Sequence, residues 1–290
     1  MPFQYTEAIG SRYLRHVPQS LQITSNENWE LFVIRMLTGT CDIKHTTTGN
    51  SITQRKNLTT ATEISHTNIT SKTLRDSLRP LTFNECEKYL RDFSRPNSGL
   101  FRNVSCELAY YFHYSQEHTH LPAFLHIYRI LEYISYSFPL VHASNSSNFQ
   151  GTFTMLKGFF RGDGGELKFF NKFVNKLFDG DPILNATADI NLVGLDPILA
   201  ARFTSCYSEK LDGMITVDTQ TNEASIKYSE IINAIVTIRN KYFHFAIGGQ
   251  KNIDTYQIKE PNEFFRILNP IFINWIGIIY FEILRSIASS

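Results

Sequence analysis

Cysteine is scarce in this sequence, and its few cysteines are scattered. The 290 residues include only Cys41, Cys86, Cys106 and Cys206, and none of these form a CxxC pair. This spacing indicates neither a zinc site nor a disulfide framework, and it suits a reducing compartment. The sequence also opens without a basic stretch followed by an apolar segment. We therefore expect no secretory signal and a cytoplasmic location.

An excess of charge is missing as well. The net charge is +1, with 42% hydrophobic and 19% charged residues, which is typical of a globular protein. This balance excludes a strongly basic coat for nucleic acid, so RNA binding would be confined to a local patch.

Long apolar runs and metal-ligand spacings are also missing. The most apolar run, 271–281, is too short for a membrane span and contains Asn274, so we expect a buried core helix and no membrane contact. Four histidines, with Glu117 among them, match no zinc spacing and lie on both sides of Pro122: His113, His118, His120 and His126. We expect neither a metal nor another cofactor.

Helix signals recur along the chain and predict a mainly α fold. Asn28 precedes an apolar stretch as a helix cap, and Thr82 with Glu85 forms a capping-box pattern. We predict an N-terminal region, 1–120, that is mostly helical and carries a β-hairpin or loop over 46–73. A C-terminal helical domain, 121–290, opens with Pro122 in the first turn of a helix.

The C-terminal domain is expected to be a bundle of about five helices. Short helices should fill 183–217, one of them starting after Asp196-Pro197, followed by a turn at Asp212-Gly213. A helix should then begin near Ser225. A final helix over 263–288 should be interrupted at Pro270.

The stretch 231–245 carries the residues on which a functional interpretation depends. At about 100° per residue, its apolar residues fall on one helical stripe: Ile231, Ala234, Ile235, Ile238, Tyr242 and Phe245. Asn240 and His244 are four residues apart and therefore neighbours, whereas Arg239 lies roughly 140° of arc from His244. One helix cannot close Arg239 and His244 on a single phosphate. Two copies related by a two-fold axis can, so the pattern favours a homodimer.

The pattern Arg-Asn-x-x-x-His at Arg239, Asn240 and His244, inside a late helix that ends before Gly248-Gly249, resembles the signature of the HEPN superfamily of ribonucleases. The resemblance covers the C-terminal half of the chain. It implies an HEPN-like helical bundle and a metal-independent endoribonuclease with its site at a homodimer interface. Many HEPN toxins carry a tyrosine two residues after the motif histidine, where a partner enzyme modifies them. Ala246 stands at that position here.

The chemistry open to these residues is acid–base and electrostatic. His244 can take a proton from a ribose 2′-hydroxyl or deliver one to the leaving 5′-oxygen, and Arg239 can hold the phosphate. Asn240 would orient His244 or the phosphate, and Lys241 would add charge at the mouth of the site. The expected products are a 2′,3′-cyclic phosphate and a 5′-hydroxyl. A row of lysines four residues apart either follows the RNA backbone or forms a solvated face: Lys168, Lys172 and Lys176.

Several functions remain open at this stage. The leading hypothesis is a toxin or antiphage effector that cleaves tRNA or other structured RNA, with an antitoxin or regulatory protein as its partner. A helix-dipole role for His244 is the alternative that involves no catalysis. Two further hypotheses are an inactive HEPN-like dimerisation module and a regulator that binds RNA or a nucleotide without cleaving it.

Overall fold

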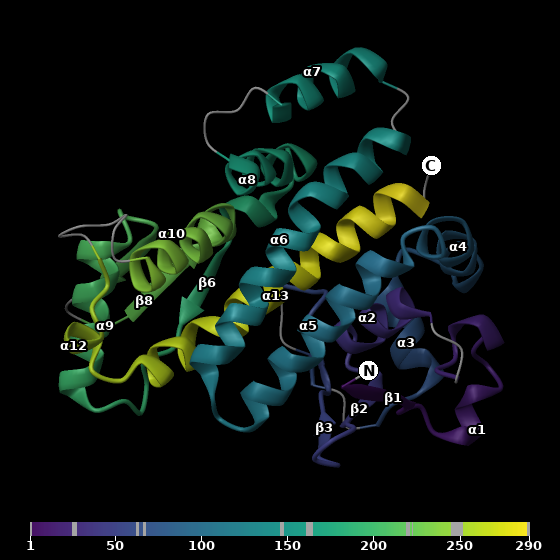
Figure 1. Cartoon of the computed structure of the whole chain (residues 1–290), viewed down its shortest axis with the longest axis horizontal. Helices are drawn as coiled ribbons and strands as arrows, with labels where there is room; N and C mark the ends of the chain where they lie inside the picture. The colour runs from purple at the N-terminus through teal and green to yellow at the C-terminus, as the bar shows by residue number, and fades with distance from the viewer. Residues whose placement is uncertain are drawn as a thin grey trace. The chain divides into compact units, whose positions relative to one another are not determined.

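The computed structural model describes residues 2–24, 28–61, 64–65, 68–145, 148–160, 165–218, 221, 223–244 and 252–288. This part of the chain is mainly helical, as the sequence predicted, and it also contains small antiparallel sheets (Figure 1). It divides into two compact units. Unit 1 comprises residues 1–117, 140–146 and 276–290, and unit 2 comprises residues 118–139 and 147–275. Two long helices contribute residues to both units.

Unit 1 begins with a small sheet. The strands β1 (Phe3–Glu7), β2 (Cys41–His45) and β3 (Ser51–Thr53) pair antiparallel in the order β1-β2-β3. A second pair joins β4 (Lys56–Asn57) to β5 (Ile64–Ser65). Both the β2–β3 hairpin and the β4–β5 pair involve residues of the 46–73 stretch, which settles the choice between hairpin and loop in favour of strands.

Two helices of unit 1, α2 and α4, start at the caps that the sequence predicted. Its elements are α1 (Ser11–Leu14), η1 (Gln19–Leu21), α2 (Trp29–Leu37), α3 (Ser71–Leu78), α4 (Phe83–Tyr89), the π-helical turn η2 (Leu90–Ser94) and α5 (Ser98–Gln116). The Asn28 side chain accepts from the Leu31 N–H. Thr82 and Glu85 cap each other's backbone at the start of α4. Every residue of α2 is buried, so this helix is the centre of unit 1.

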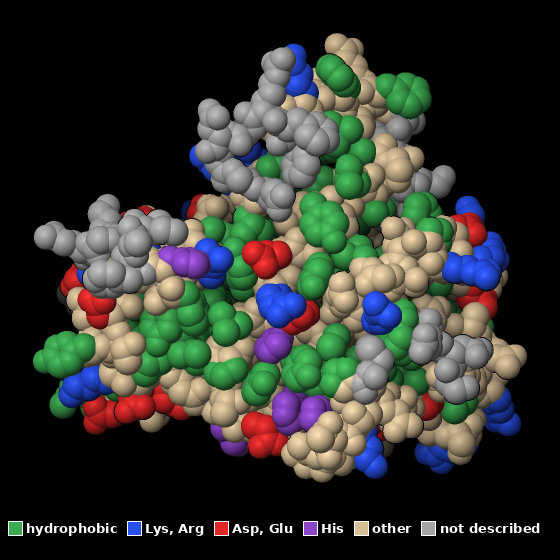
Figure 2. All heavy atoms as spheres, viewed as in Figure 1, with side chains coloured by type: hydrophobic (Ala, Val, Ile, Leu, Met, Phe, Trp, Pro, Cys, Tyr) green, Lys and Arg blue, Asp and Glu red, His purple; other side chains and the backbone are tan. Residues whose placement is uncertain are grey.

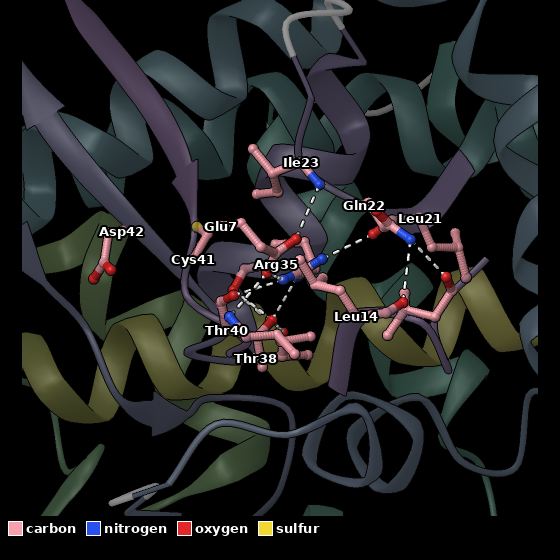
Figure 3. Close-up of polar contacts among 12 residues, drawn as sticks. Glu7, Leu14, Leu21, Gln22, Ile23, Arg35, Thr38, Thr40, Cys41 and Asp42 are labelled. Carbon is pink, nitrogen blue, oxygen red and sulfur yellow. Dashed lines mark hydrogen bonds and ion pairs between the residues drawn. The ribbon is translucent and has the colours of Figure 1, made fainter. Parts of the chain in front are cut away.

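A buried arginine ties α2 to its surroundings (Figure 3). The Arg35 side chain is fully buried and forms an ion pair with Glu7 at the end of β1. Its Nε donates to Thr40 Oγ1 at 2.8 Å and its Nη1 to the Leu21 carbonyl at 2.8 Å. A buried guanidinium is tolerated when it is paired in this way. Arg35 therefore has a structural role.

Unit 2 contains the first part of α6 (His120–Asn145) and the first part of α13 (Pro261–Ala288). Between them lie α7 (Phe149–Phe160), α8 (Gly165–Leu177), η3 (Pro182–Asn185), β6 (Thr187–Ile190), α9 (Pro197–Lys210), β7 (Ile215–Asp218), β8 (Glu223–Lys227), η4 (Tyr228–Glu230), α10 (Ile231–Phe243) and α12 (Thr255–Ile258). Asp196 caps α9, and Asp212 and Gly213 form the turn after it, both as predicted.

The sequence interpretation was wrong about two features of unit 2. A three-stranded antiparallel sheet, β6-β8-β7, occupies part of the region where only short helices were expected. Because 223–227 is a strand of this sheet, the motif helix begins at Ile231 rather than near Ser225.

The final helix also differs from the prediction, because α13 runs unbroken through Pro270. Proline removes one backbone donor, and packing on the neighbouring turns is enough to hold the helix together. Beside the proline, Asn269 Nδ2 donates to the His120 carbonyl at 2.7 Å. By length and composition this helix is apolar enough to cross a membrane, but 78% of its most apolar window is buried within the fold. That burial favours a core helix.

Candidate functional site

Helix α10 presents its apolar stripe to the core, as its periodicity predicted. Ile231, Ala234, Ile235 and Ile238 are each 0% exposed. Tyr242 is half-buried. Phe245, Ala246 and the Gly248-Gly249 pair lie outside the described residues. The buried stripe fixes the rotation of the helix, so its polar residues take defined positions on the flanks.

His244 lies at the C-terminal end of α10. It follows Phe243, the last residue of the helix, and leaves the helical conformation with φ −122° and ψ 84°. Its backbone N–H donates to the Asn240 carbonyl at 3.2 Å. The side chain is half-buried, so part of it reaches the surface of its own chain. The imidazole is therefore open to a ligand or a partner.

Arg239 and Asn240 are held together one turn earlier. Arg239 Nη1 donates to Asn240 Oδ1 at 3.0 Å. The guanidinium carbon also lies 4.9 Å from the ring centroid of Tyr128, on α6, which is a cation–π contact. In the described part of the chain, no hydrogen bond joins Arg239 or Asn240 to the His244 side chain. The amide thus orients the arginine within one chain, and the histidine stands apart.

Lys241 is not a freely accessible charge. Its Nζ lies 2.7 Å from Asp212 Oδ2 and donates to the Lys210 carbonyl at 2.5 Å. Its side chain is only 12% exposed. The contact fastens α10 to the turn after α9, so Lys241 has a structural role besides the charge expected at the mouth of the site.

The lysine row of α8 is exposed along its length. The side chains of Lys168, Lys172 and Lys176 are all exposed. This exposure agrees equally with a surface that faces RNA and with a solvated one. Of the three, only Lys168 lines the groove described next.

A groove of about 760 Å³ runs beside α10 in unit 2. One wall is a stripe along η4 and α10, made by Glu230, Asn233, Val236, Thr237 and Asn240. The other walls are Tyr128 and Glu132 on α6, Leu167 and Lys168 on α8, and Asp212 and Met214 around the turn after α9. Of the motif residues, Asn240 lines the groove, whereas Arg239 and His244 are not among the residues that line it.

Apart from Asn240 and Lys168, the sequence interpretation did not identify these lining residues as part of a site. Two spacings in the sequence could have indicated the groove, because each places polar groups on one face of a helix. One is the i, i+4 pair Tyr128 and Glu132, and the other is the series Glu230, Asn233, Thr237 and Asn240. Burial, followed by the nearby Glu132 carboxylate, raises the pKa of Tyr128. The phenol therefore stays protonated at neutral pH.

The described residues include no group of three or more His, Cys, Asp or Glu side chains arranged to hold a metal ion. His113, one of the histidines weighed as a metal ligand, stacks on His45 with ring centroids 5.0 Å apart. His118 and His120 lie 6.2 Å apart between ring centroids.

Comparisons with known proteins add no relative. No family model, no curated protein and no solved structure matches the chain.

Proposed function

We propose that the chain is a metal-independent endoribonuclease whose site is shared between two copies. The half-buried position of His244 at the end of α10, one turn from the Arg239–Asn240 pair, is the observation that supports this most. A histidine packed against its own core would be unavailable for proton transfer. The resemblance of these three residues to the HEPN signature supplies the reaction class.

The reaction needs a group that moves protons and a group that binds the phosphate. An imidazole ring nitrogen can accept a proton or donate one, so His244 removes the proton from the 2′-hydroxyl or protonates the leaving 5′-oxygen. Arg239 cannot lose its proton and forms two parallel hydrogen bonds with phosphate oxygens. Attack of the 2′-oxygen on phosphorus breaks the bond to the 5′-oxygen. The products are a 2′,3′-cyclic phosphate and a 5′-hydroxyl, and no metal takes part.

The separation of Arg239 from His244 is the argument for a second copy. Within one chain the Arg239 guanidinium contacts the Tyr128 ring and Asn240, and in the described residues no hydrogen bond joins it to the His244 side chain. A two-fold axis near the end of α10 would place Arg239 of one copy beside His244 of the other.

The surface near the end of α10 suits such an association. Figure 2 shows hydrophobic side chains gathered between the end of α10 and the start of α13. Leu125 on α6 is 39% exposed, and Tyr242 and Phe243 are half-buried. An exposed apolar area of this kind is typical of an interaction surface.

The proposed setting follows from this chemistry. An enzyme that cuts tRNA or other structured RNA halts translation, which is the activity of a toxin or antiphage effector in the cytoplasm. Such an enzyme needs restraint, and an antitoxin or regulatory protein would provide it.

The test is cleavage of total tRNA and rRNA in EDTA. We expect the wild type to produce fragments with 2′,3′-cyclic phosphate and 5′-hydroxyl ends. His244→Ala should be inactive but folded, because its half-exposed side chain contributes little to packing. His16→Ala, which removes an exposed histidine in unit 1, is the matched control and should cleave normally.

Two other outcomes would support the alternatives. A folded dimer that binds RNA without cutting it, in the presence or absence of divalent metal, would indicate an RNA- or nucleotide-binding regulator. A dimer that neither binds nor cleaves RNA would indicate a dimerisation module. Expression toxicity that depends on His244 would exclude both.

A further inference from the structure

The groove beside α10 has the size and walls of a ligand site. Its volume of about 760 Å³ lies within the usual range for small-molecule pockets. Leu167 on α8, Met214 after α9 and Val236 on α10 supply apolar walls. Polar groups converge between these walls, and Asn240 connects the groove to the motif. A planar base with polar edges fits this combination.

The charges in the groove disfavour a phosphate. Three carboxylates, those of Glu132, Asp212 and Glu230, face one ammonium group, that of Lys168. Lys241 compensates Asp212 from outside the lining set, with Nζ 2.7 Å from Oδ2. Arg239, which contacts the lining residues Tyr128 and Asn240, balances the third carboxylate. The groove therefore has no net positive charge to attract an RNA backbone, but its carboxylates can accept hydrogen bonds from an uncharged group.

Glu230 is the carboxylate best placed to receive such donors. Its Oε2 accepts from Asn233 Nδ2 at 3.0 Å, and Asn233 Oδ1 accepts from Asn171 Nδ2 at 3.2 Å. This chain of amides orients the carboxylate. Within the described part of the structure, no other hydrogen bond reaches the Glu230 side chain, so Oε1 can still accept one. Glu230 is half-buried, which strengthens any hydrogen bond made there.

We propose that this groove binds a guanine base of the RNA substrate; the inference rests on the proposed ribonuclease function. Guanine carries N1–H and N2–H₂ side by side on one edge, which matches the two oxygens of a carboxylate. Adenine and cytosine place an acceptor beside their amino group, and the N3–H of uracil lies between two carbonyls. A carboxylate would face a repelling lone pair in each of these cases.

The lysine row on α8 would bind the RNA backbone next to this base site. Lys168 lies at the groove, and Lys172 and Lys176 continue along the exposed face of α8. Phosphates held on this row would position the strand, and the base in the groove would specify it.

The test measures binding without cleavage. Hexamers of 2′-O-methyl RNA lack the attacking hydroxyl, so the full-length wild-type protein cannot cut them. Four adenine-rich hexamers would differ only at one central nucleotide, which carries guanine, hypoxanthine (the base of inosine), adenine or cytosine. Fluorescence anisotropy gives the affinities. Inosine lacks only the 2-amino group, and we expect it to bind about tenfold more weakly than guanine, because a hydrogen bond to a charged group is lost.

Two variants and one control identify the groove. Glu230→Gln can still accept from Asn233, and the ratio of guanine to inosine affinity should fall close to one. Leu167→Trp fills the groove from its apolar wall and should also abolish the preference. Glu209→Gln makes the same charge change on α9 outside the groove and should leave the ratio unchanged. Circular dichroism confirms that each variant is folded.

Equal affinity of the wild type for guanine, inosine and adenine hexamers would overturn the base site, while the cleavage assay would still judge the ribonuclease proposal. A guanine preference that persists in both Glu230→Gln and Leu167→Trp would likewise overturn it. Failure of the wild type to bind any hexamer would overturn the base site and count against RNA as the substrate.

Discussion

The Arg239 guanidinium lies over the ring of Tyr128, with its central carbon 4.9 Å from the ring centroid. The two residues belong to α10 and α6, so the packing of these helices sets where the arginine can point. Burial, together with the nearby Glu132 carboxylate, raises the pKa of the Tyr128 phenol, so the ring carries a neutral hydroxyl beside the arginine. Tyr128 is therefore a candidate positioning residue for the proposed phosphate-binding arginine.

Two substitutions of Tyr128 distinguish the contribution of its aromatic ring from that of its hydroxyl group. Tyr128→Phe keeps the aromatic face and should retain cleavage close to that of the wild type. Tyr128→Leu removes it, and kcat should fall about tenfold, consistent with the strength of a partly buried cation–π contact. Steady-state cleavage of a defined RNA measures both variants. Equal loss in the two variants would show that the hydroxyl, not the ring, supports the site.

A buried carboxyl group in unit 1 should make stability depend on pH. Glu30 is fully buried, and Tyr89 and Tyr280 donate to its Oε1. Burial raises its pKa from 4.5 to about 8. Between these values the unfolded chain is ionised while the folded chain keeps its proton. The stabilising contribution of Glu30 to the free energy of unfolding is thus complete below pH 4.5. It is lost as the pH rises towards 8, at about 1.4 kcal/mol per pH unit.

Glu30→Gln tests this dependence, because an amide oxygen still accepts from both tyrosines. Urea denaturation from pH 5 to pH 9 should show the wild type losing stability relative to the variant up to about pH 8, with no further change above it. Parallel curves for the two proteins would contradict the prediction. The comparison also cancels the opposite contribution of His113, whose pKa is lowered by burial and by His45.

A glycine in α13 marks a close approach of two backbones in unit 1. A Cβ atom added at Gly277 would lie 2.2 Å from the Leu58 carbonyl oxygen. Gly277→Ala should therefore reduce the free energy of unfolding by about 1–3 kcal/mol or more, as overpacking does. Gly158→Ala, in α7, has open space around the new methyl group and should be neutral or slightly stabilising. Similar melting temperatures for the two variants would contradict the close approach.

The features that the sequence predicted well depend on neighbours in the chain. Asn28, the Thr82–Glu85 pair and Asp196 cap helices through hydrogen bonds that span two or three residues. The sheet β6-β8-β7 was missed because it pairs Thr187 with Lys227, far apart in sequence, in strands of four and five residues. Such short strands leave little periodicity to detect.

The candidate site shows the same limit. The apolar stripe of α10 and the positions of its flanking polar residues follow from helical spacing alone. The contact of Arg239 with Tyr128 and that of Lys241 with Asp212 depend on how α6 and the turn after α9 pack against α10. Spacing along one helix contains no information about these partners.

Complementation between two inactive variants is the most direct test of a site shared by two copies. Arg239→Ala and His244→Ala should each be inactive alone. A heterodimer of the two has one intact site, with His244 from the first chain and Arg239 from the second. A random mixture should regain roughly a quarter of wild-type activity, because half of its dimers carry one intact site of two. His244→Ala mixed with the double variant should stay inactive. No cleavage in a mixture shown to contain heterodimers would contradict the shared site.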